Sequence, residues 1–398
     1  MYLLNARTQK LEHFLDLPPY AILSHAWQSG EAHRFHEIGT PGVCQKPGYD
    51  KVQGCCTLAL QHGLDYVWID TCCADANSIT AFDEALNSSY AWFNQAAVCF
   101  VYLHDVESRE RPEQESSTFR RSKWFSRAWT LQELLAPGNV FFFAKDWKEI
   151  GTKAGLASVI SSVTGIHTDA LMHPERVPHF SVATRMSWAK GRKSSKPEDR
   201  VYALMGLFGV NLPIVYGQGE TETFMKLQHE IIKKSDDQSI LAWRFFTRAP
   251  SPRTSSFLAD SPDYFADCGD VHRIPSDQLL EYCIKHSHPT ANPRSGFLLT
   301  CRGLQATLPV RSRRPGVLDA LLACARGPGV WNGSKYAVNL DDAEVICIRL
   351  RKPTPGVHPY ERMDEHSLEA INIRDAHDFV LQDVQLSASQ RLPTRLDS

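Results

Sequence analysis

The residues best suited to chemistry lie in the segment Phe125–Pro137, which reads Phe-Ser-Arg-Ala-Trp-Thr-Leu-Gln-Glu-Leu-Leu-Ala-Pro. Glu133 follows Trp129 by four residues, one turn later along a helix, so that the carboxylate and the indole can be neighbours. A Glu in this position is either an ordinary solvated charge or a carboxylate in a half-dry pocket, where burial tunes its pKa for catalysis. The segment alone leaves both interpretations open.

A set of elements that could position these side chains is visible in the hydrophobic pattern. Short apolar runs predict four strands, at Tyr20–Ala26, Tyr66–Asp70, Ala97–Leu103 and Val140–Ala144. Helical spacing predicts helices at Tyr49–His62, Ile79–Gln95 and Lys148–Val163. The alternation of strand and helix, with strands that are continuously apolar, predicts an α/β fold in which helices cover both faces of a parallel sheet.

Polar side chains follow three of these strands. In parallel sheets, ligands bind in the crevice beyond the carboxyl ends of the strands, so we expect these side chains to share one rim. They are Ser24, His25, Trp27, Asp70, Cys72, His104 and Asp105. No C-x-x-C pair occurs among the eleven cysteines, and no metal site is predicted.

Each rim residue has a chemical and a structural interpretation. Ser24 and His25 could bind a phosphate or a ribose, or could form a hydrogen-bonded turn. Trp27 could stack on an aromatic ring of a ligand, or could cover the core. Asp70 could accept hydrogen bonds from ribose hydroxyls, or could cap a helix or turn. Cys72 could pair with a rim histidine as a thiol nucleophile, although nothing in the sequence orients such a base.

Basic residues near the anchor segment also have two interpretations. Arg127 could contact a phosphate or pair with Glu133. The basic residues Lys190, Arg192, Lys193 and Lys196 are predicted to form a solvated loop.

The composition is that of a globular chain. Its 398 residues favour two domains over one, and 43% hydrophobic residues are enough for a sizeable core. A net charge of -2 and the absence of a basic run argue against nucleic acid and membrane surfaces as partners. Without a signal peptide pattern or an apolar run of roughly 20 residues, the chain is predicted to be cytoplasmic, with its cysteines as buried free thiols.

The chain divides into three predicted regions. Residues 1–180 are predicted to form the α/β domain, and residues 181–248 a helical extension packed on it. Beyond residue 249 Gly, Pro and Ser become frequent between short apolar runs such as Gly296–Thr300 and Val345–Leu350, so residues 249–398 are predicted to be a β-rich region of unknown role.

Three blocks of this sequence resemble the fungal heterokaryon incompatibility (HET) domain, in the order and approximate spacing of that family. They are Ala21–Trp27, Tyr66–Cys73 and Ser126–Pro137. Arg185–Ala189, Glu198–Tyr202 and Tyr216–Gly219 resemble the segment that follows many such domains. The resemblance covers about Pro19 to Trp243. The chain departs from the family at Ala74, where a bulky aliphatic residue is usual, and at Gln28, where a small residue is common.

The resemblance implies a cytoplasmic protein of fungal non-self recognition and programmed cell death. HET domains are thought to be remote relatives of TIR domains, which have a flavodoxin-like sheet, and Trp129–Leu134 is similar to the Trp-Cys-Leu-x-Glu-Leu segment of TIR domains. In TIR enzymes that cleave NAD, the Glu of this segment is catalytic, which implies that Glu133 is the catalytic residue here. NAD would be a substrate rather than a tightly bound cofactor. The residues that this resemblance places around it are Ser24, His25, Trp27, Asp70, Cys72, Arg127 and Trp129.

Two further functional hypotheses remain open beside the enzyme. The chain could be a non-enzymatic signalling module that self-associates through its HET domain under the control of an upstream receptor protein. It could also be a member without activity, given the departures at Ala74 and Gln28.

Overall fold

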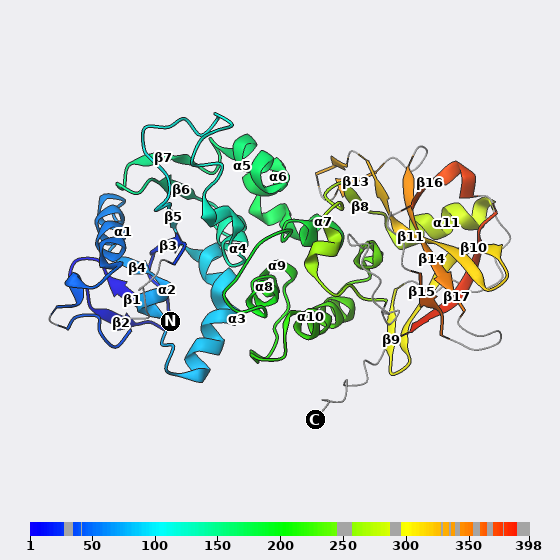
Figure 1. Cartoon of the computed structure of the whole chain (residues 1–398), viewed down its shortest axis with the longest axis horizontal. Helices are drawn as coiled ribbons and strands as arrows, with labels where there is room; N and C mark the ends of the chain where they lie inside the picture. The colour runs from blue at the N-terminus through cyan, green and yellow to red at the C-terminus, as the bar shows by residue number, and fades with distance from the viewer. Residues whose placement is uncertain are drawn as a thin grey trace, which may run out of the picture. The chain divides into compact units, whose positions relative to one another are not determined.

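Two compact units make up this computed structural model (Figure 1). Unit 1 comprises residues 1–177 and 191–219, and unit 2 comprises residues 178–190 and 220–398. The structure describes the chain except for residues 28–34, 41, 245–256, 287–295, 328, 334–335, 339–342, 353–358, 364–368, 377 and 388–398. The division into domains at residues 180 and 248 stays a prediction.

Unit 1 is built on a seven-stranded mixed sheet with the strand order β2-β1-β4-β3-β5-β6-β7. The four central strands are parallel; β1 and β7 flank them antiparallel, and β2 pairs antiparallel with β1. The bounds are β1 Tyr2–Asn5, β2 Leu11–His13, β3 Ala21–His25, β4 Tyr66–Trp68, β5 Val98–Tyr102, β6 Val140–Phe143 and β7 Glu149–Thr152.

The central strands confirm the predicted α/β fold. Across the sheet, the four parallel strands lie in the order β4-β3-β5-β6. Numbered by their order along the chain this is 2-1-3-4, the strand order of flavodoxin-like sheets. Every residue of β3 and of β5 is buried, as expected for strands covered on both faces. The carboxyl ends of β3 and β4 are neighbours, because these strands pair directly.

Helices surround this sheet, as Figure 1 shows for α1, α3 and α4. Two of the predicted helices are confirmed as α1 and α3, and Ser78 caps α3 by accepting a hydrogen bond from the backbone N–H of Ala81. The helices of unit 1 are α1 Tyr49–Gln61, α2 Asp70–Cys73, α3 Ile79–Gln95, α4 Thr130–Leu135, α5 Ala157–Thr164, α6 Thr168–Met172, α8 Asp199–Tyr202 and α9 Met205–Phe208.

The short helix α4 is held in place at its carboxyl end. Lys153, which is buried, donates hydrogen bonds from Nζ to the backbone carbonyls of Leu134 and Pro137. A cation there satisfies carbonyls that the helix leaves unpaired and complements the helix dipole. Within α4, Glu133 is the one partly exposed side chain. The buried remainder of the helix therefore fixes where this carboxylate points.

Several predicted elements were wrong in detail. The segment after β6 forms strand β7 and then α5, rather than one helix from Lys148 to Val163. The short apolar run Ile240–Trp243 predicts a strand, but residues 238–241 form a 3-10 helix. The polar stretch Cys72–Ser78 predicts a turn, and the structure begins this stretch inside the helical turn α2. Strands β1 and β2 have too few apolar residues to stand out from a loop by periodicity, and were missed.

Unit 2 is dominated by an eight-stranded antiparallel sheet, which confirms the β-rich C-terminal region. Strands β15, β14, β11, β10 and β17 lie in that order, with β8, β9 and β16 paired to the sides of this path. Its strands are β8 Val271–Arg273, β9 Leu298–Thr300, β10 Gly303–Arg314, β11 Val317–Arg326, β14 Glu344–Arg351, β15 Glu361–Arg362, β16 Glu369–Asn372 and β17 Val380–Ser387, beside the hairpin β12 Val330–Trp331 and β13 Tyr336–Ala337. Its helices are α7 Val182–Ser187, α10 Glu220–Lys234 and α11 Ser276–His286.

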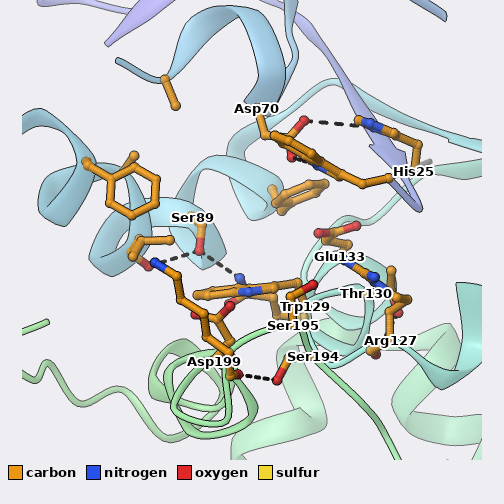
Figure 2. A pocket seen from close by; sticks show the side chains of 18 of the residues that line it. His25, Asp70, Ser89, Arg127, Trp129, Thr130, Glu133, Ser194, Ser195 and Asp199 are labelled. Carbon is orange, nitrogen blue, oxygen red and sulfur yellow. Dashed lines mark hydrogen bonds and ion pairs between the residues drawn. The ribbon is translucent and has the colours of Figure 1, made fainter. Parts of the chain in front are cut away.

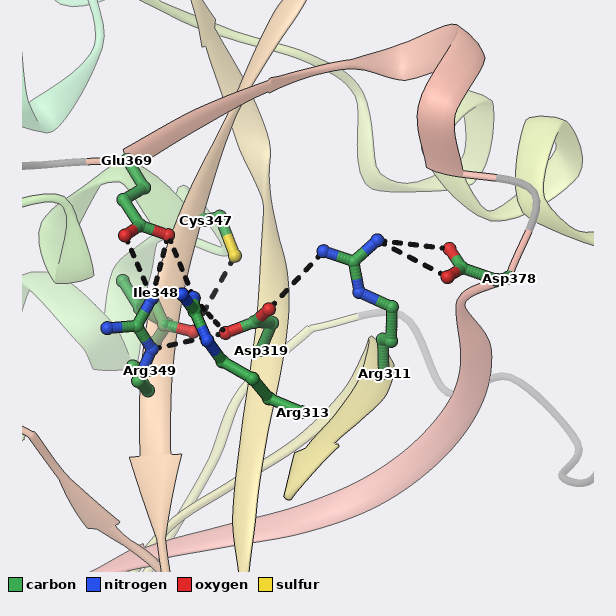
Figure 3. Close-up of polar contacts among 8 residues, drawn as sticks. All are labelled: Arg311, Arg313, Asp319, Cys347, Ile348, Arg349, Glu369 and Asp378. Carbon is green, nitrogen blue, oxygen red and sulfur yellow. Dashed lines mark hydrogen bonds and ion pairs between the residues drawn. The ribbon is translucent and has the colours of Figure 1, made fainter.

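One face of this sheet carries a network of charges around a buried aspartate (Figure 3). The Asp319 side chain is only 3% exposed and lies 3.3 Å from Arg349 Nε, 3.3 Å from Arg311 Nη2 and 3.6 Å from Arg313 Nη1. Arg349 also donates from Nη2 to both carboxylate oxygens of Glu369, at 2.8 Å each. Because these residues come from β10, β11, β14 and β16, the network ties four strands together.

We expect Asp319→Asn to lower the free energy of unfolding by about 3 kcal/mol, because it removes the buried carboxylate that three guanidinium groups share as a counter-charge. Asp378→Asn is the control, since Asp378 meets Arg311 at an exposed position and such pairs contribute less than about 1 kcal/mol. Urea denaturation of both variants measures the difference. Equal losses would show that Asp319 is no more important than a surface charge.

None of the helices in the described part of the chain has both the length and the apolar character needed to cross a bilayer.

Candidate functional site

A cavity of about 580 Å³ opens in unit 1 beyond the carboxyl ends of β3 and β4. Its volume lies within the range of small-molecule sites. In Figure 2 the labelled side chains surround an open space, with His25 and Asp70 on one side and Ser194, Ser195 and Asp199 on the other. Glu133 lines the cavity between them. The half-dry pocket is therefore the environment that the structure gives this carboxylate.

Two buried side chains hold the Glu133 carboxyl in place. Ser24, at the end of β3, donates a hydrogen bond from its hydroxyl to Oε2 of Glu133. The Ser24 oxygen in turn accepts the indole N–H of Trp124, at 2.8 Å. Since an indole nitrogen only donates, the Ser24 hydrogen is left for Glu133. The three groups form a directed chain that ends at the cavity.

Burial raises the pKa of Glu133 to about 8 from its ordinary 4.5. The hydrogen bond from Ser24 lowers this pKa, the negative charge of Asp70 raises it, and the positive charges of Arg127 and Arg192 lower it. The carboxyl is thus mostly protonated at neutral pH, and a cation placed beside it would favour the ionised form.

Asp70 organises the opposite wall. Its Oδ2 accepts the indole N–H of Trp27 at 2.7 Å, and its Oδ1 accepts the backbone N–H of Thr71 at 2.7 Å. His25 Nδ1 lies 3.8 Å from Asp70 Oδ1, and the His25 and Trp27 rings are stacked with their centroids 6.4 Å apart. The carboxylate therefore orients an aromatic pair, while its side chain stays 37% exposed and open to a ligand.

Helix α3 supplies an apolar wall. Ala85, Ser89 and Phe93 recur at a spacing of four residues on its buried face, and all three line the cavity. Trp68 from β4 packs beside Phe93, with ring centroids 6.1 Å apart, and also lines the cavity. A Trp that alternates inward on a buried strand is expected in the core, and Trp68 is 4% exposed.

The remaining wall comes from the segment 191–219, which the sequence had suggested was partly a solvated loop. That prediction was wrong for Arg192, which is buried and donates from Nη1 to the carbonyl of Arg127 and to Thr130 Oγ1, at 2.9 and 3.2 Å. Lys193 and Lys196 are exposed but line the cavity. Arg192 was hard to recognise because its burial depends on partners some 60 residues earlier in the chain.

A second carboxylate sits in this wall. Asp199 accepts hydrogen bonds from the Tyr216 hydroxyl, at 3.0 Å, and from the side chain of Trp129. Burial raises the pKa of Asp199, and these hydrogen bonds lower it. Asp199 and Tyr216 were not predicted as site residues, although both lie in segments that resemble the region trailing HET domains.

Of the eight predicted site residues, six line the cavity: His25, Trp27, Asp70, Arg127, Trp129 and Glu133. Ser24 lies directly behind Glu133. Cys72 is fully buried, has its thiol 3.7 Å from the Thr71 hydroxyl, and is not among the lining residues.

The residues that follow strand β5, and the two positions that depart from the HET family, are placed as follows. Asp105 accepts hydrogen bonds from Ser122 and Lys123, and neither it nor His104 lines the cavity, so the expected single rim was wrong for strand β5. Ala74 lines the cavity, and Gln28 lies outside the described residues.

All eleven cysteines are free thiols, and only Cys44 and Cys301 are exposed. In the described ranges, no three His, Cys, Asp or Glu side chains are arranged to hold a metal ion.

Comparison with known proteins supports the resemblance seen in the sequence. The vegetative incompatibility protein HET-E-1 of Podospora anserina is 39% identical to this chain over 222 residues. The match covers 54% of this chain and 16% of HET-E-1, so this chain corresponds to a small part of that relative. No family model and no solved structure matches the chain. The predicted relationship to a fungal heterokaryon incompatibility protein is confirmed.

The raised pKa of Glu133 predicts a stability that depends on pH. Between pH 4.5 and about 8 the folded protein holds a proton that the unfolded chain has released, so the free energy of unfolding falls as the pH rises through this window. Glu133→Gln removes the titrating carboxyl, and with it this fall of the free energy of unfolding. Relative to wild type, the variant should gain about 4 kcal/mol between the two pH values, since each unit of pKa difference corresponds to about 1.4 kcal/mol.

Urea denaturation at both pH values measures this gain. Glu149→Gln, which neutralises an exposed carboxylate on β7, is the matched control and should change far less with pH. A Glu133→Gln profile parallel to that of wild type would mean that the carboxyl is not desolvated.

Proposed function

We propose that the cavity at Glu133 hydrolyses the N-glycosidic bond of NAD or a related nucleotide, and that this activity acts in fungal vegetative incompatibility and cell death. The observation that carries the proposal is the Glu133 carboxyl, held by Ser24 at the centre of a partly desolvated cavity with aromatic walls. The similarity to HET-E-1 supports the biological context.

The chemistry needs one carboxylate close to the ribose. When the bond between the nicotinamide nitrogen and C1′ breaks, the electron pair leaves with neutral nicotinamide, and positive charge spreads over C1′ and the ring oxygen. Ionised Glu133 would stabilise that charge and accept a hydrogen bond from a ribose hydroxyl. Water then bonds to C1′ and releases a proton, which gives ADP-ribose.

The neighbouring residues suit the rest of such a substrate. Trp27 and Trp129 present aromatic surfaces to the cavity, on which a nicotinamide or adenine ring could stack. Asp70 keeps an exposed carboxylate edge that could accept a second ribose hydroxyl. The positive charge of the bound nicotinamide ring would favour ionised Glu133, so the substrate itself would bring the carboxyl into its active form.

Glu133→Gln should reduce NAD hydrolysis by at least about a hundredfold, because an amide cannot balance the developing positive charge. Release of free nicotinamide by the purified full chain at high concentration is the measurement, with Glu149→Gln as the control. Undiminished turnover by Glu133→Gln would exclude this residue. No turnover by wild type at any concentration would favour the non-enzymatic, self-associating module instead.

The value of kcat/KM should rise with pH through a midpoint at about 8 and level off above it, since the ionised carboxyl is the active form and this profile reports the free protein. Ser24→Ala removes the hydrogen bond that favours ionisation and should move the midpoint upward by about one pH unit. Ser108→Ala, which also removes a hydroxyl bonded to a carboxylate but far from the cavity, should leave the midpoint in place. A profile that falls as the pH rises would mean that Glu133 acts as an acid.

A further inference from the structure

A cluster of basic and hydroxyl side chains lines the cavity on the side opposite His25 and Asp70. Lys193, Ser194, Ser195 and Lys196 are consecutive in the chain, and Arg127 lies beside them. Nothing in the proposed cleavage step uses these five groups. We call Arg127 and the segment 193–196 the cationic rim.

The backbone of this rim is fixed to the start of α4. Lys193 donates its N–H to the carbonyl of Ser126 at 2.7 Å and accepts the N–H of Ala128 at 2.9 Å, which makes a parallel bridge opposite Arg127. The buried Arg192 guanidinium adds its bonds to Arg127 and Thr130. Since Glu133 lies on the same helix, the distance between the rim and Glu133 is set by these contacts rather than by loop motion.

The charges of the cavity favour an anion at the rim. Three basic side chains, Arg127, Lys193 and Lys196, and three acidic ones, Asp70, Glu133 and Asp199, line the cavity. Burial raises the pKa of Glu133 to about 8, so this acid carries less than its full charge at neutral pH. The lining is therefore net positive there, and the two lysine side chains are exposed enough to reach a ligand.

Lys196 contacts an aromatic ring. Its Nζ lies 3.6 Å from the centre of the Tyr216 ring, an arrangement worth only about 1 kcal/mol at an exposed position. A phosphate group is a stronger partner for an ammonium than an aromatic face is. Binding of a phosphate can therefore draw Lys196 away from Tyr216.

We propose that the cationic rim binds the pyrophosphate of the substrate, so that the site accepts nucleotides with at least two phosphates and rejects nucleosides. The assignment deepens the function proposed above and rests on it for the role of Glu133. The diphosphate would lie across Lys193, Lys196 and Arg127, with the serine hydroxyls as additional donors. The ribose to be cleaved would then reach the Glu133 end of the cavity.

Calorimetry on the full-length Glu133→Gln chain, which should bind without cleaving, tests this assignment with ADP-ribose and adenosine as probes. ADP-ribose should bind at least about tenfold more tightly than adenosine. Its affinity should fall steeply between about 50 and 300 mM salt, whereas that of adenosine should change little. Equal affinities, or an ADP-ribose affinity independent of salt, would overturn the assignment.

The variant Lys193→Gln/Lys196→Gln tests the residues, and its exposed positions make a folding defect easy to avoid. It should lose at least about tenfold in affinity for ADP-ribose and nothing for adenosine. Lys145→Gln/Lys148→Gln, which changes two exposed lysines away from the cavity, should bind ADP-ribose as the parent does. Equal losses of ADP-ribose affinity in the two double variants would show that only the overall charge of the protein matters, and would overturn the assignment.

Activity separates the two proposals. If wild type cleaves NAD but the rim variant cleaves NAD and nicotinamide riboside with unchanged kcat/KM, the rim assignment fails and the proposed function stands. If wild type cleaves nothing but the rim variant still loses ADP-ribose binding, the rim assignment stands and the proposed function fails.

Discussion

The hydrogen bonds that run from Trp124 through Ser24 to Glu133 are the constraint on which this site depends. They connect the end of β3, the turn before α4 and α4 itself, three segments that come from positions up to 109 residues apart. Trp124 is fixed by its ring contacts with Phe125 and Phe142, whose centroids lie 5.1 and 5.7 Å away. A rigid aromatic core thus sets the direction of one serine hydroxyl, and that hydroxyl sets the carboxylate.

The electrostatics of the cavity follow from this arrangement. A carboxyl that is partly desolvated costs stability once it ionises, and the fold offsets the cost with one hydroxyl and two guanidinium groups. Arg192 is itself desolvated, and burial lowers its pKa to about 10 while the Glu133 charge raises it. Desolvated groups of opposite charge lower stability when they are not fully compensated, and proteins tolerate such groups mainly at functional sites.

Much of the frame could be predicted from sequence because its signals are local. Buried strands such as β3 and β5 are continuous apolar runs, and α3 repeats its apolar residues every three or four positions, so both types of element could be predicted without their neighbours. Glu133 could be proposed as a catalytic residue only because Trp129–Leu134 is similar to a known segment, since its spacing to Trp129 left both interpretations open. The burial of Arg192 and the placement of Asp199 could not, because polar residues in a loop reveal nothing about partners elsewhere in the chain. Strand β7 was likewise hidden, since an edge strand of four residues has little periodicity to show.

The path of the chain through the two units limits where the protein can be divided into fragments that keep the cavity. Unit 1 is not one continuous stretch, because its last part, Gly191–Gly219, follows the passage of residues 178–190 through unit 2. The carboxylate of Glu198 closes this last part by accepting the N–H groups of Gly217 and Gly219, at 2.8 and 2.9 Å. A fragment cut at residue 177 would lack one wall of the cavity. A gene fusion or recombination event that transfers a complete cavity must therefore carry the interrupting piece of the second unit with it.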